Sequence, residues 1–116
     1  MTAPNIVNVT TINGKTAMAV ANSTAANVLS NASGSNTVVK VNTLTIANFS
    51  ASAVTANVDI YRSSTAYLLI GNVVVPANST MIVSGKDTSF YLEEGDGLRV
   101  ATSANTNVIS SYEVIS

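Results

Sequence analysis

The sequence predicts an all-β protein, an antiparallel β-sandwich of about seven to nine short strands. Apolar residues recur at every second position in several segments, which is the period of a strand with one buried face. Val, Ile, Leu and Thr dominate those segments, and β-branched residues favour strands. From Val38 onward turn-forming residues arrive roughly every 8–12 residues, as in a sandwich or barrel. This pattern leaves jelly-roll and immunoglobulin-like connectivities open.

The length of the chain predicts one domain over residues 1–116. Residues 1–12 are rich in apolar, β-branched side chains, so we expect an extended arm or an edge strand there. Such a segment either closes the domain's own sheets or reaches a neighbouring subunit. The similarly apolar C-terminal segment, which includes Val108 and Ile115, is expected to pair inside the domain.

The N-terminal quarter gives one strong signal and one ambiguous one. Asn13-Gly14 predicts a two-residue hairpin turn, with Lys15–Val20 as the return strand. Ala17–Leu29 is Ala-rich and admits a helical turn, although Ser23-Thr24 and the nearby Asn residues weaken that interpretation.

One predicted strand changes its apolar parity partway along. Val39 and Val41 fall on one face, whereas Leu44 and Ile46 fall on the other. This switch predicts a bulge near Asn42–Thr43, or a strand that passes from one sheet to the other.

The clearest half-buried strand runs over Val54–Ile60, and the same alternation returns at Leu98 and Val100 with Arg99 facing the other way. Turn chemistry separates the strands. The predicted turns are Ser33-Gly34-Ser35-Asn36, Arg62-Ser63-Ser64-Thr65, Gly71-Asn72, Pro76-Ala77-Asn78, Ser84-Gly85-Lys86-Asp87, Glu94-Gly95-Asp96-Gly97 and Ala104-Asn105-Thr106-Asn107.

The composition argues against several classes of function. Without His or Cys the chain lacks the commonest general base and the thiolate metal ligand. A net charge of −1 with five Lys and Arg residues argues against nucleic-acid binding. The longest apolar runs, Ala66–Ile70 and Val73–Ala77, are far shorter than the roughly 20 residues that span a membrane. The opening residues lack the features of a signal peptide, so we expect synthesis inside a cell.

Glu93-Glu94-Gly95-Asp96-Gly97 is the one acidic cluster. Neighbouring carboxylates can bind Ca²⁺ or act as an acid/base pair, but the alternating ligand positions of a Ca²⁺ loop are missing. We therefore interpret the segment as a turn between two strands. A hydrolase would need Asp59, Glu93, Asp96 or Glu113 to meet in one pocket. We expect no enzyme activity and no catalytic, cofactor-binding or metal-binding residues.

Three weaker patterns have ordinary explanations. Gly14-Lys15-Thr16 matches the end of a P-loop, but the glycine required five positions earlier is Val9, so the match is due to chance. Tyr61 and Tyr67 are expected to form a cross-strand pair. Phe90 and Tyr91 are adjacent on one predicted strand, so one ring should point inward and the other outward. A sugar-binding tyrosine surface is disfavoured, and the N-x-S/T triplets carry no glycosylation meaning without a signal peptide. The tyrosines are Tyr61, Tyr67, Tyr91 and Tyr112, and the triplets start at Asn8, Asn22, Asn31, Asn48 and Asn78.

The low charge favours a protein that works in an assembly. Only 9% of the residues are charged, against about 25% in a typical soluble domain. Ser, Thr and Asn supply the polar surface instead, which gives little repulsion between copies.

From Thr37 onward, three blocks resemble known proteins: Ala47-Asn48-Phe49-Ser50, Val75-Pro76-Ala77-Asn78-Ser79-Thr80 and Leu92 to Val100. They are similar to blocks in small virion proteins of tailed phages, notably those that infect marine cyanobacteria. The resemblance implies a β-sandwich present in many copies on a virion, made in the host cytoplasm. It would be a capsid decoration (cement) subunit that binds coat proteins through strand edges and loops. The alternatives are a neck, collar or tail accessory subunit, or a receptor- or glycan-binding fibre module. The implied partners are other virion proteins and further copies of the chain, with no nucleic acid, membrane or cofactor. The blocks mark turns and strand faces, so no functional residue is carried over.

Overall fold

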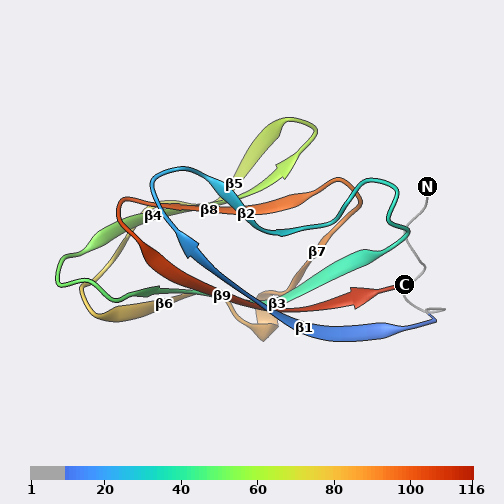
Figure 1. Cartoon of the computed structure of the whole chain (residues 1–116), viewed down its shortest axis with the longest axis horizontal. Coiled ribbons are helices and arrows are strands. Elements are labelled where there is room, and N and C mark those ends of the chain that lie inside the picture. The colour runs from blue at the N-terminus through green and yellow to red at the C-terminus, as the bar shows by residue number, and fades with distance from the viewer. Residues whose placement is uncertain (1–9) are drawn as a thin grey trace.

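The computed structural model describes residues 10–116, which form nine strands and one short 3₁₀ helix (Figure 1). Five strands are nine or more residues long, longer than the sequence pattern predicts. The elements are β1 (Ile12–Ala21), β2 (Ala26–Ser30), β3 (Val38–Asn48), β4 (Val54–Arg62), β5 (Thr65–Val75), β6 (Ser79–Ser84), η1 (Lys86–Thr88), β7 (Phe90–Leu92), β8 (Gly97–Thr102) and β9 (Thr106–Ile115).

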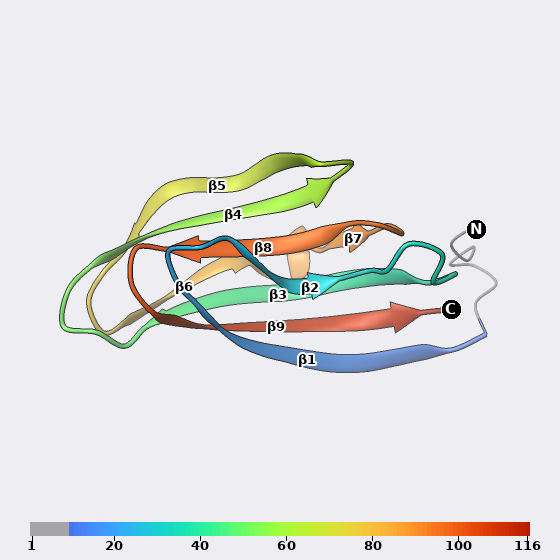
Figure 2. The ribbon, with the colours of Figure 1, turned by 45° about the horizontal axis from the view of Figure 1, so that its top comes forward.

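The strands form two antiparallel sheets that pack face to face, which confirms the predicted sandwich. The five-stranded sheet has the order β1-β9-β3-β6, with β7 also paired to β3. The four-stranded sheet has the order β2-β8-β4-β5. Figure 1 shows the sheets as two layers, and Figure 2 shows β1, β9 and β3 lying side by side.

The connectivity is that of a jelly roll. Apart from β7, the strands pair from the ends of the chain inward: β1 with β9, β2 with β8, β3 with β6 and β4 with β5. Pairing of β3 with β9 and of β4 with β8 completes the two sheets, as in an eight-stranded jelly roll. An immunoglobulin-like fold pairs several consecutive strands, whereas within residues 10–116 only β4 and β5 are consecutive and paired.

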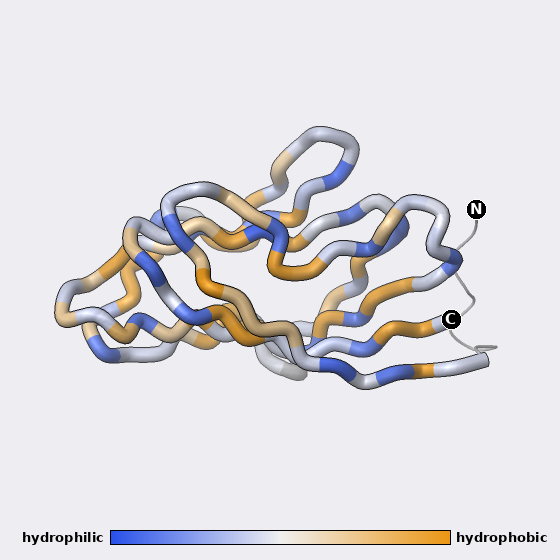
Figure 3. The backbone as a smooth tube through the Cα atoms, viewed as in Figure 1, coloured by the Kyte–Doolittle hydropathy of each residue, from blue (hydrophilic) through white to orange (hydrophobic). Residues whose placement is uncertain are grey.

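The core lies between the two layers and is built from the alternating apolar positions. Leu44 and Ile46 of β3 are fully buried, and they face Val58 of β4 and Leu98 of β8 in the same cluster. Figure 3 shows the hydrophobic segments along strands of both layers and hydrophilic residues at many of the turns. Burial of this apolar surface is the main term that stabilises the fold.

The parity change in β3 is a bulge, which confirms the first of the two predicted alternatives, a bulge or a passage between sheets. The register between β3 and β9 shifts between Val41 and Thr43, and β3 stays in one sheet. The buried Ser110 hydroxyl donates a hydrogen bond of 2.8 Å to the Thr43 carbonyl. The bulge therefore keeps Val41 and Leu44 both in the core although they are three positions apart.

The predicted hairpin at Asn13-Gly14 is wrong. Both residues lie inside β1, where Asn13 pairs with Val114 and Gly14 with Glu113. Neither has the positive φ that a two-residue hairpin turn requires. The strand partner comes from the other end of the chain, so a local turn signal could not reveal it. Lys15–Val20 is confirmed as strand.

The predicted turn at Gly71-Asn72 is also wrong, because these residues form a bulge inside β5. Val73 pairs with Ala56 and Ile70 with Val58, so the two residues oppose Asn57 alone. Asn72 has a φ of 52°, and its N–H donates to the Asn57 Oδ1 at 2.8 Å. This bulge and the tight turns that favour Gly and Asn both place a residue at positive φ, so the sequence signal does not separate them.

The remaining predictions near the N-terminus have mixed outcomes. Ala17–Leu29 holds the end of β1, a turn and most of β2, so the helical alternative is wrong. Residues 1–9 of the predicted arm lie outside the described residues. Ile12 begins β1, which is an edge strand, and the C-terminal strand β9 pairs inside the domain as expected.

One buried asparagine at each end of the sandwich holds the loops together. Asn31 donates to the carbonyls of Thr37 and Leu92, at 2.8 and 3.0 Å. Asn48 donates to the carbonyls of Ser52 and Val75, at 2.9 and 3.1 Å. Each side chain therefore bonds backbone carbonyls of two different loops or strand ends. These hydrogen bonds also satisfy the buried amide group itself.

Candidate interaction surfaces

On the outer face of the four-stranded sheet, polar side chains of β4 and β8 contact one another. Asp59 of β4 pairs in register with Arg99 of β8, and Nε of Arg99 lies 2.8 Å from Oδ1 of Asp59. The Arg99 guanidinium also lies 4.1 Å from the centre of the Tyr61 ring. The hydrogen bond from Arg99 to Asp59, opposed by desolvation and aided by the charge of Asp59, raises the pKa of Arg99. The charged groups of this face therefore satisfy one another.

A second ion pair lies where β4 ends. Arg62 Nε donates to Asp96 Oδ1 at 2.7 Å, and its Nη2 lies 2.6 Å from Oδ2 of Asp96 and 3.0 Å from Glu93. Burial raises the pKa of Asp96, but hydrogen bonds from Arg62 and from the Glu93 N–H, with the charge of Arg62, outweigh it and hold the pKa below its ordinary value. Asp96 is thus an ionised, buried group, and both of its carboxylate oxygens accept hydrogen bonds.

The acidic cluster Glu93-Glu94-Gly95-Asp96-Gly97 forms the predicted turn between β7 and β8, with Gly95 at a φ of 91°. A cavity of about 590 Å³ opens beside it. Within residues 10–116 no group of three or more acidic, His or Cys side chains is placed to hold a metal ion. The cavity is lined by Ser33, Tyr61, Arg62, Ser63, Ser64, Glu93, Glu94, Gly95 and Asp96.

The four carboxylates named as hydrolase candidates do not gather in one place. Glu93 and Asp96 share Arg62. Asp59 belongs to β4 of the four-stranded sheet, and Glu113 belongs to β9 of the five-stranded sheet. Sequence reasoning missed Arg62 and Arg99 as partners, because only the pairing of β4 with β8 brings them to Asp96 and Asp59.

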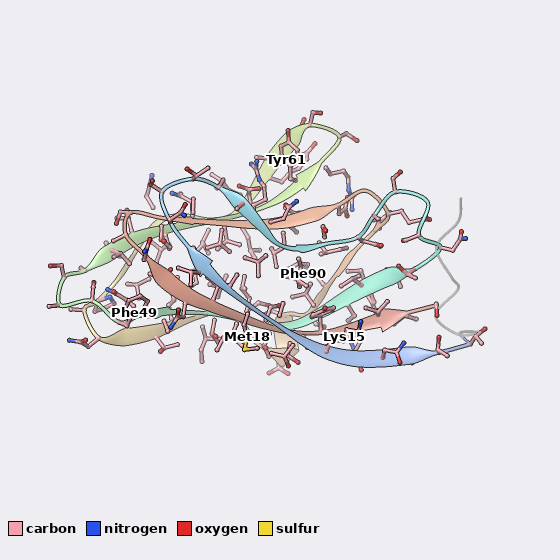
Figure 4. The ribbon with its side chains drawn as sticks, in the orientation of Figure 1. Lys15, Met18, Phe49, Tyr61 and Phe90 are labelled. Atoms are coloured by element: carbon pink, nitrogen blue, oxygen red, sulfur yellow. The ribbon has the colours of Figure 1, made fainter. Side chains whose placement is uncertain are left out.

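The aromatic predictions have mixed outcomes. Tyr67 pairs with Ile60 and Tyr61 with Ala66, so the two tyrosines point to opposite faces and the predicted cross-strand pair is wrong. Phe90 packs against the core and Tyr91 is 42% exposed, as predicted for neighbouring strand residues. Figure 4 places Phe90 between the sheets. No tyrosine-lined surface joins all four rings, because they lie on β4, β5, β7 and β9.

The P-loop-like and triplet patterns also find structural explanations. Gly14-Lys15-Thr16 lies within β1, not in a loop before a helix, which confirms a chance match. Of the triplet asparagines, Asn31 and Asn48 are buried and engaged with backbone carbonyls.

The outer face of the five-stranded sheet is different, because a row of exposed apolar side chains crosses it from edge to edge, whereas the exposed Leu68 and Val74 of the other sheet both lie on its edge strand β5. Met18, Ile109, Thr45 and Ile82 are successive register partners on β1, β9, β3 and β6, and we call them the apolar row. Met18 is 76% exposed, Ile82 70% and Ile109 44%. Figure 4 shows Met18 on the outer side of this sheet.

Few charges lie on that face. Gly14, Glu113, Lys40 and Tyr91 are register partners on β1, β9, β3 and β7, and we call them the charged row. Lys40 and Glu113 are the only charged strand residues that the register places on this face within residues 10–116. All the ion pairs among the described residues belong instead to the four-stranded sheet and its loops.

Comparison with known proteins gives no family model and no curated protein that matches the chain. Among residues 10–116, no helix has the length and apolar character needed to cross a membrane.

Proposed function

We propose that this protein is a non-enzymatic structural subunit of a phage virion, most specifically a capsid decoration subunit that binds coat proteins through strand edges and loops. The proposal includes synthesis in the host cytoplasm and a final place on the particle. Its partners are other virion proteins and further copies of itself, rather than nucleic acid or membrane.

The outer face of the five-stranded sheet is the observation that carries this proposal. A monomer rarely keeps large, adjacent apolar side chains in water unless they meet a partner. Here Met18 and Ile82, at opposite edges of one sheet, are both more than two-thirds exposed, and Ile109 lies between them. A chain with 9% charged residues gives little repulsion to keep such faces apart.

The free edges of the sheets differ in how well they suit a partner. β1 pairs with β9 in an unbroken register of ten residues, so its free edge offers a regular template. The register between β5 and its partner β4 breaks on both sides of Val58 of β4, and such bulges discourage edge pairing. This favours β1 over β5 as the strand edge that contacts a coat protein.

The jelly roll supports the proposal only in part. Jelly rolls build viral capsid proteins, lectins and several enzymes, so the fold is compatible with a virion role without requiring it. The resemblance of the blocks from Ala47 to Val100 to phage virion proteins is the reason that we favour that role over the others. A neck, collar or tail accessory subunit would use the same surfaces.

A glycan-binding fibre module is the second candidate, and the cavity beside Arg62 favours it. Serine hydroxyls, carboxylates and the Tyr61 ring line that space of about 590 Å³, and such groups suit a neutral sugar. Glycan-array binding by the purified protein that is lost in Ser64→Trp would support this candidate. An array without signal would count against it.

Quantitative mass spectrometry of purified phage particles from the infection that produces the protein tests the leading proposal. We expect the protein in many copies per particle. In a second step, particles that lack the protein should bind it when the purified protein is added. Absence from particles would overturn the proposal, and a few copies confined to one vertex or tail would favour the neck or tail alternative.

A further inference from the structure

We infer that the outer face of the five-stranded sheet binds a second copy of this chain, face to face, about a two-fold axis that runs along the strands between β9 and β3. The inference rests on the proposed function, since this face is its proposed assembly surface, and it names the partner. Three features of the face select that partner: its symmetry, its charges and its area.

The first feature is that the apolar row matches itself. A two-fold axis in the interface, parallel to the strands and between β9 and β3, exchanges β1 with β6 and β9 with β3. Met18 of one copy then faces Ile82 of the other, and Ile109 faces Thr45. Each large exposed side chain of the row therefore meets a side chain of the row in the second copy.

The second feature is the pair of opposite charges on neighbouring strands. Lys40 on β3 and Glu113 on β9 are register partners. The same axis places Lys40 of each copy over Glu113 of the other, which gives two opposite-charge contacts. An axis across the strands and through the apolar row gives neither charge a partner. Charge complementarity therefore selects the axis along the strands.

The third feature is the area of the face. Four strands at about 4.8 Å spacing and ten residues at about 3.3 Å each give a face of about 19 by 33 Å. This corresponds to about 600 Å² per copy, or about 1,200 Å² in total, which reaches the lower end of specific, stable interfaces. Stacked sheets commonly pack at about 30°, and the long Lys40 side chain can span the resulting offset.

The first experiment measures the oligomeric state of the purified full chain by sedimentation equilibrium. We expect a monomer–dimer equilibrium. Because each substitution occurs twice in a symmetric dimer, Ile82→Asp should weaken dimerisation about 100-fold, and Met18→Asp should act similarly. Leu68→Asp is the matched control, since Leu68 is 65% exposed on the other sheet, and it should leave the dimer unchanged.

The second experiment tests the axis by exchanging charges between copies. Lys40→Glu alone puts two carboxylates on each face, and Glu113→Lys alone puts two ammonium groups there. Each variant should dimerise about 10-fold more weakly than the unaltered chain. An equal mixture of the two variants should recover dimers that contain one of each, because opposite charges then meet across the interface.

Several outcomes would overturn the inference: a strict monomer at high concentration, a dimer that Ile82→Asp does not weaken, a trimer, or a charge-exchanged mixture that does not recover. Circular dichroism of each variant checks that it folds, and Leu68→Asp controls for added charge. The result is separable from the proposed function, because a dimer missing from particles contradicts only that function, whereas a monomer found on particles contradicts only the dimer.

Discussion

The two outer faces of this sandwich expose different kinds of side chain to water. On the four-stranded sheet, Asp59, Arg99 and Tyr61 form a chain of ionic and cation–π contacts within one molecule. On the five-stranded sheet, an equivalent central position is held by Ile109, with Met18 beside it. The centre of the first face is stabilised by its own polar partners, and its exposed Leu68 and Val74 lie on the edge strand β5, whereas the second face exposes apolar side chains from edge to edge. Polar substitutions should therefore affect folding on one sheet and association on the other.

Removing the Asp96 carboxylate should give the largest loss of stability. Asp96→Ala leaves the Glu93 N–H without its acceptor and removes the bidentate partner of Arg62, which keeps only Glu93, and the Asp96 side chain is 1% exposed. Since Arg62 remains half-exposed to water, which screens its charge, we expect a loss of about 2 kcal/mol in the free energy of unfolding. Urea unfolding at neutral pH measures it, with Glu94→Ala as the exposed control, and equal stability of the two variants would contradict the expectation.

The Arg62–Asp96 pair also predicts that the free energy of unfolding falls in acid. The pKa of Asp96 is lower in the folded protein than its ordinary value of 3.8. Its stabilising effect is therefore complete above about pH 5 and is lost as the pH falls through the folded value. Urea midpoints measured from pH 6 downward should converge for the unaltered protein and Asp96→Ala. A gap that stays constant into strong acid would show that the carboxylate is not the cause.

Breaking the ion pair on the outer face of the four-stranded sheet should have the next largest effect. Asp59→Ala leaves the Arg99 guanidinium without its bidentate acceptor. We expect the melting temperature to fall by about 5 °C. Differential scanning calorimetry measures this change, and Thr55→Ala on the outer face of the same strand is the control. An unchanged melting temperature would mean that this face is not stabilised by its own polar contacts.

Removing the aromatic ring beside Arg99 should have a smaller effect of the same sign. Tyr61→Leu keeps an apolar side chain but loses the ring under the guanidinium. The melting temperature should fall by less than in Asp59→Ala. In the Asp59→Ala background the added effect of Tyr61→Leu should differ from its effect alone, since both residues contact Arg99. Strict additivity in the double variant would argue against a shared contact.

The smallest effect on folding is expected on the five-stranded sheet. Met18→Ser and Ile82→Ser change side chains that are mostly in water, so each should alter the free energy of unfolding of the dilute protein by less than about 0.5 kcal/mol. The same substitutions should reduce retention on a hydrophobic-interaction column. A large loss of folding stability would show that these side chains support the fold rather than a contact with another molecule.

The sequence predicted most strands because a strand records its environment locally. Alternation over Val54–Ile60 marks one buried face, and the parity change between Val41 and Leu44 marks a bulge. Both signals need only the residues themselves and the two-residue period of a strand. The same local signals failed at Asn13-Gly14 and misled at Gly71-Asn72. They report a backbone preference and not the strand that will pair there.

Neither surface could be found from the sequence. Arg62 and Asp96 are 34 positions apart, and Met18 and Ile109 come from opposite ends of the chain. No spacing rule brings such residues together, because their meeting depends on which strand pairs with which. Exposed apolar residues such as Ile82 were also indistinguishable from core residues, since periodicity gives the two faces of a strand without saying which one is buried.

By itself, then, the sequence determined an all-β chain with a sandwich pattern, the positions of most strands and turns, and a polar surface with few charges. These properties follow from side-chain chemistry and two-residue periodicity, which act over a few positions. Only the tertiary structure decided the jelly-roll connectivity, the ion pairs of Arg62 and Arg99, and the apolar row across the five-stranded sheet. Each of these requires strands distant in the sequence to lie side by side, and the free energy that selects such pairings belongs to the packed core as a whole.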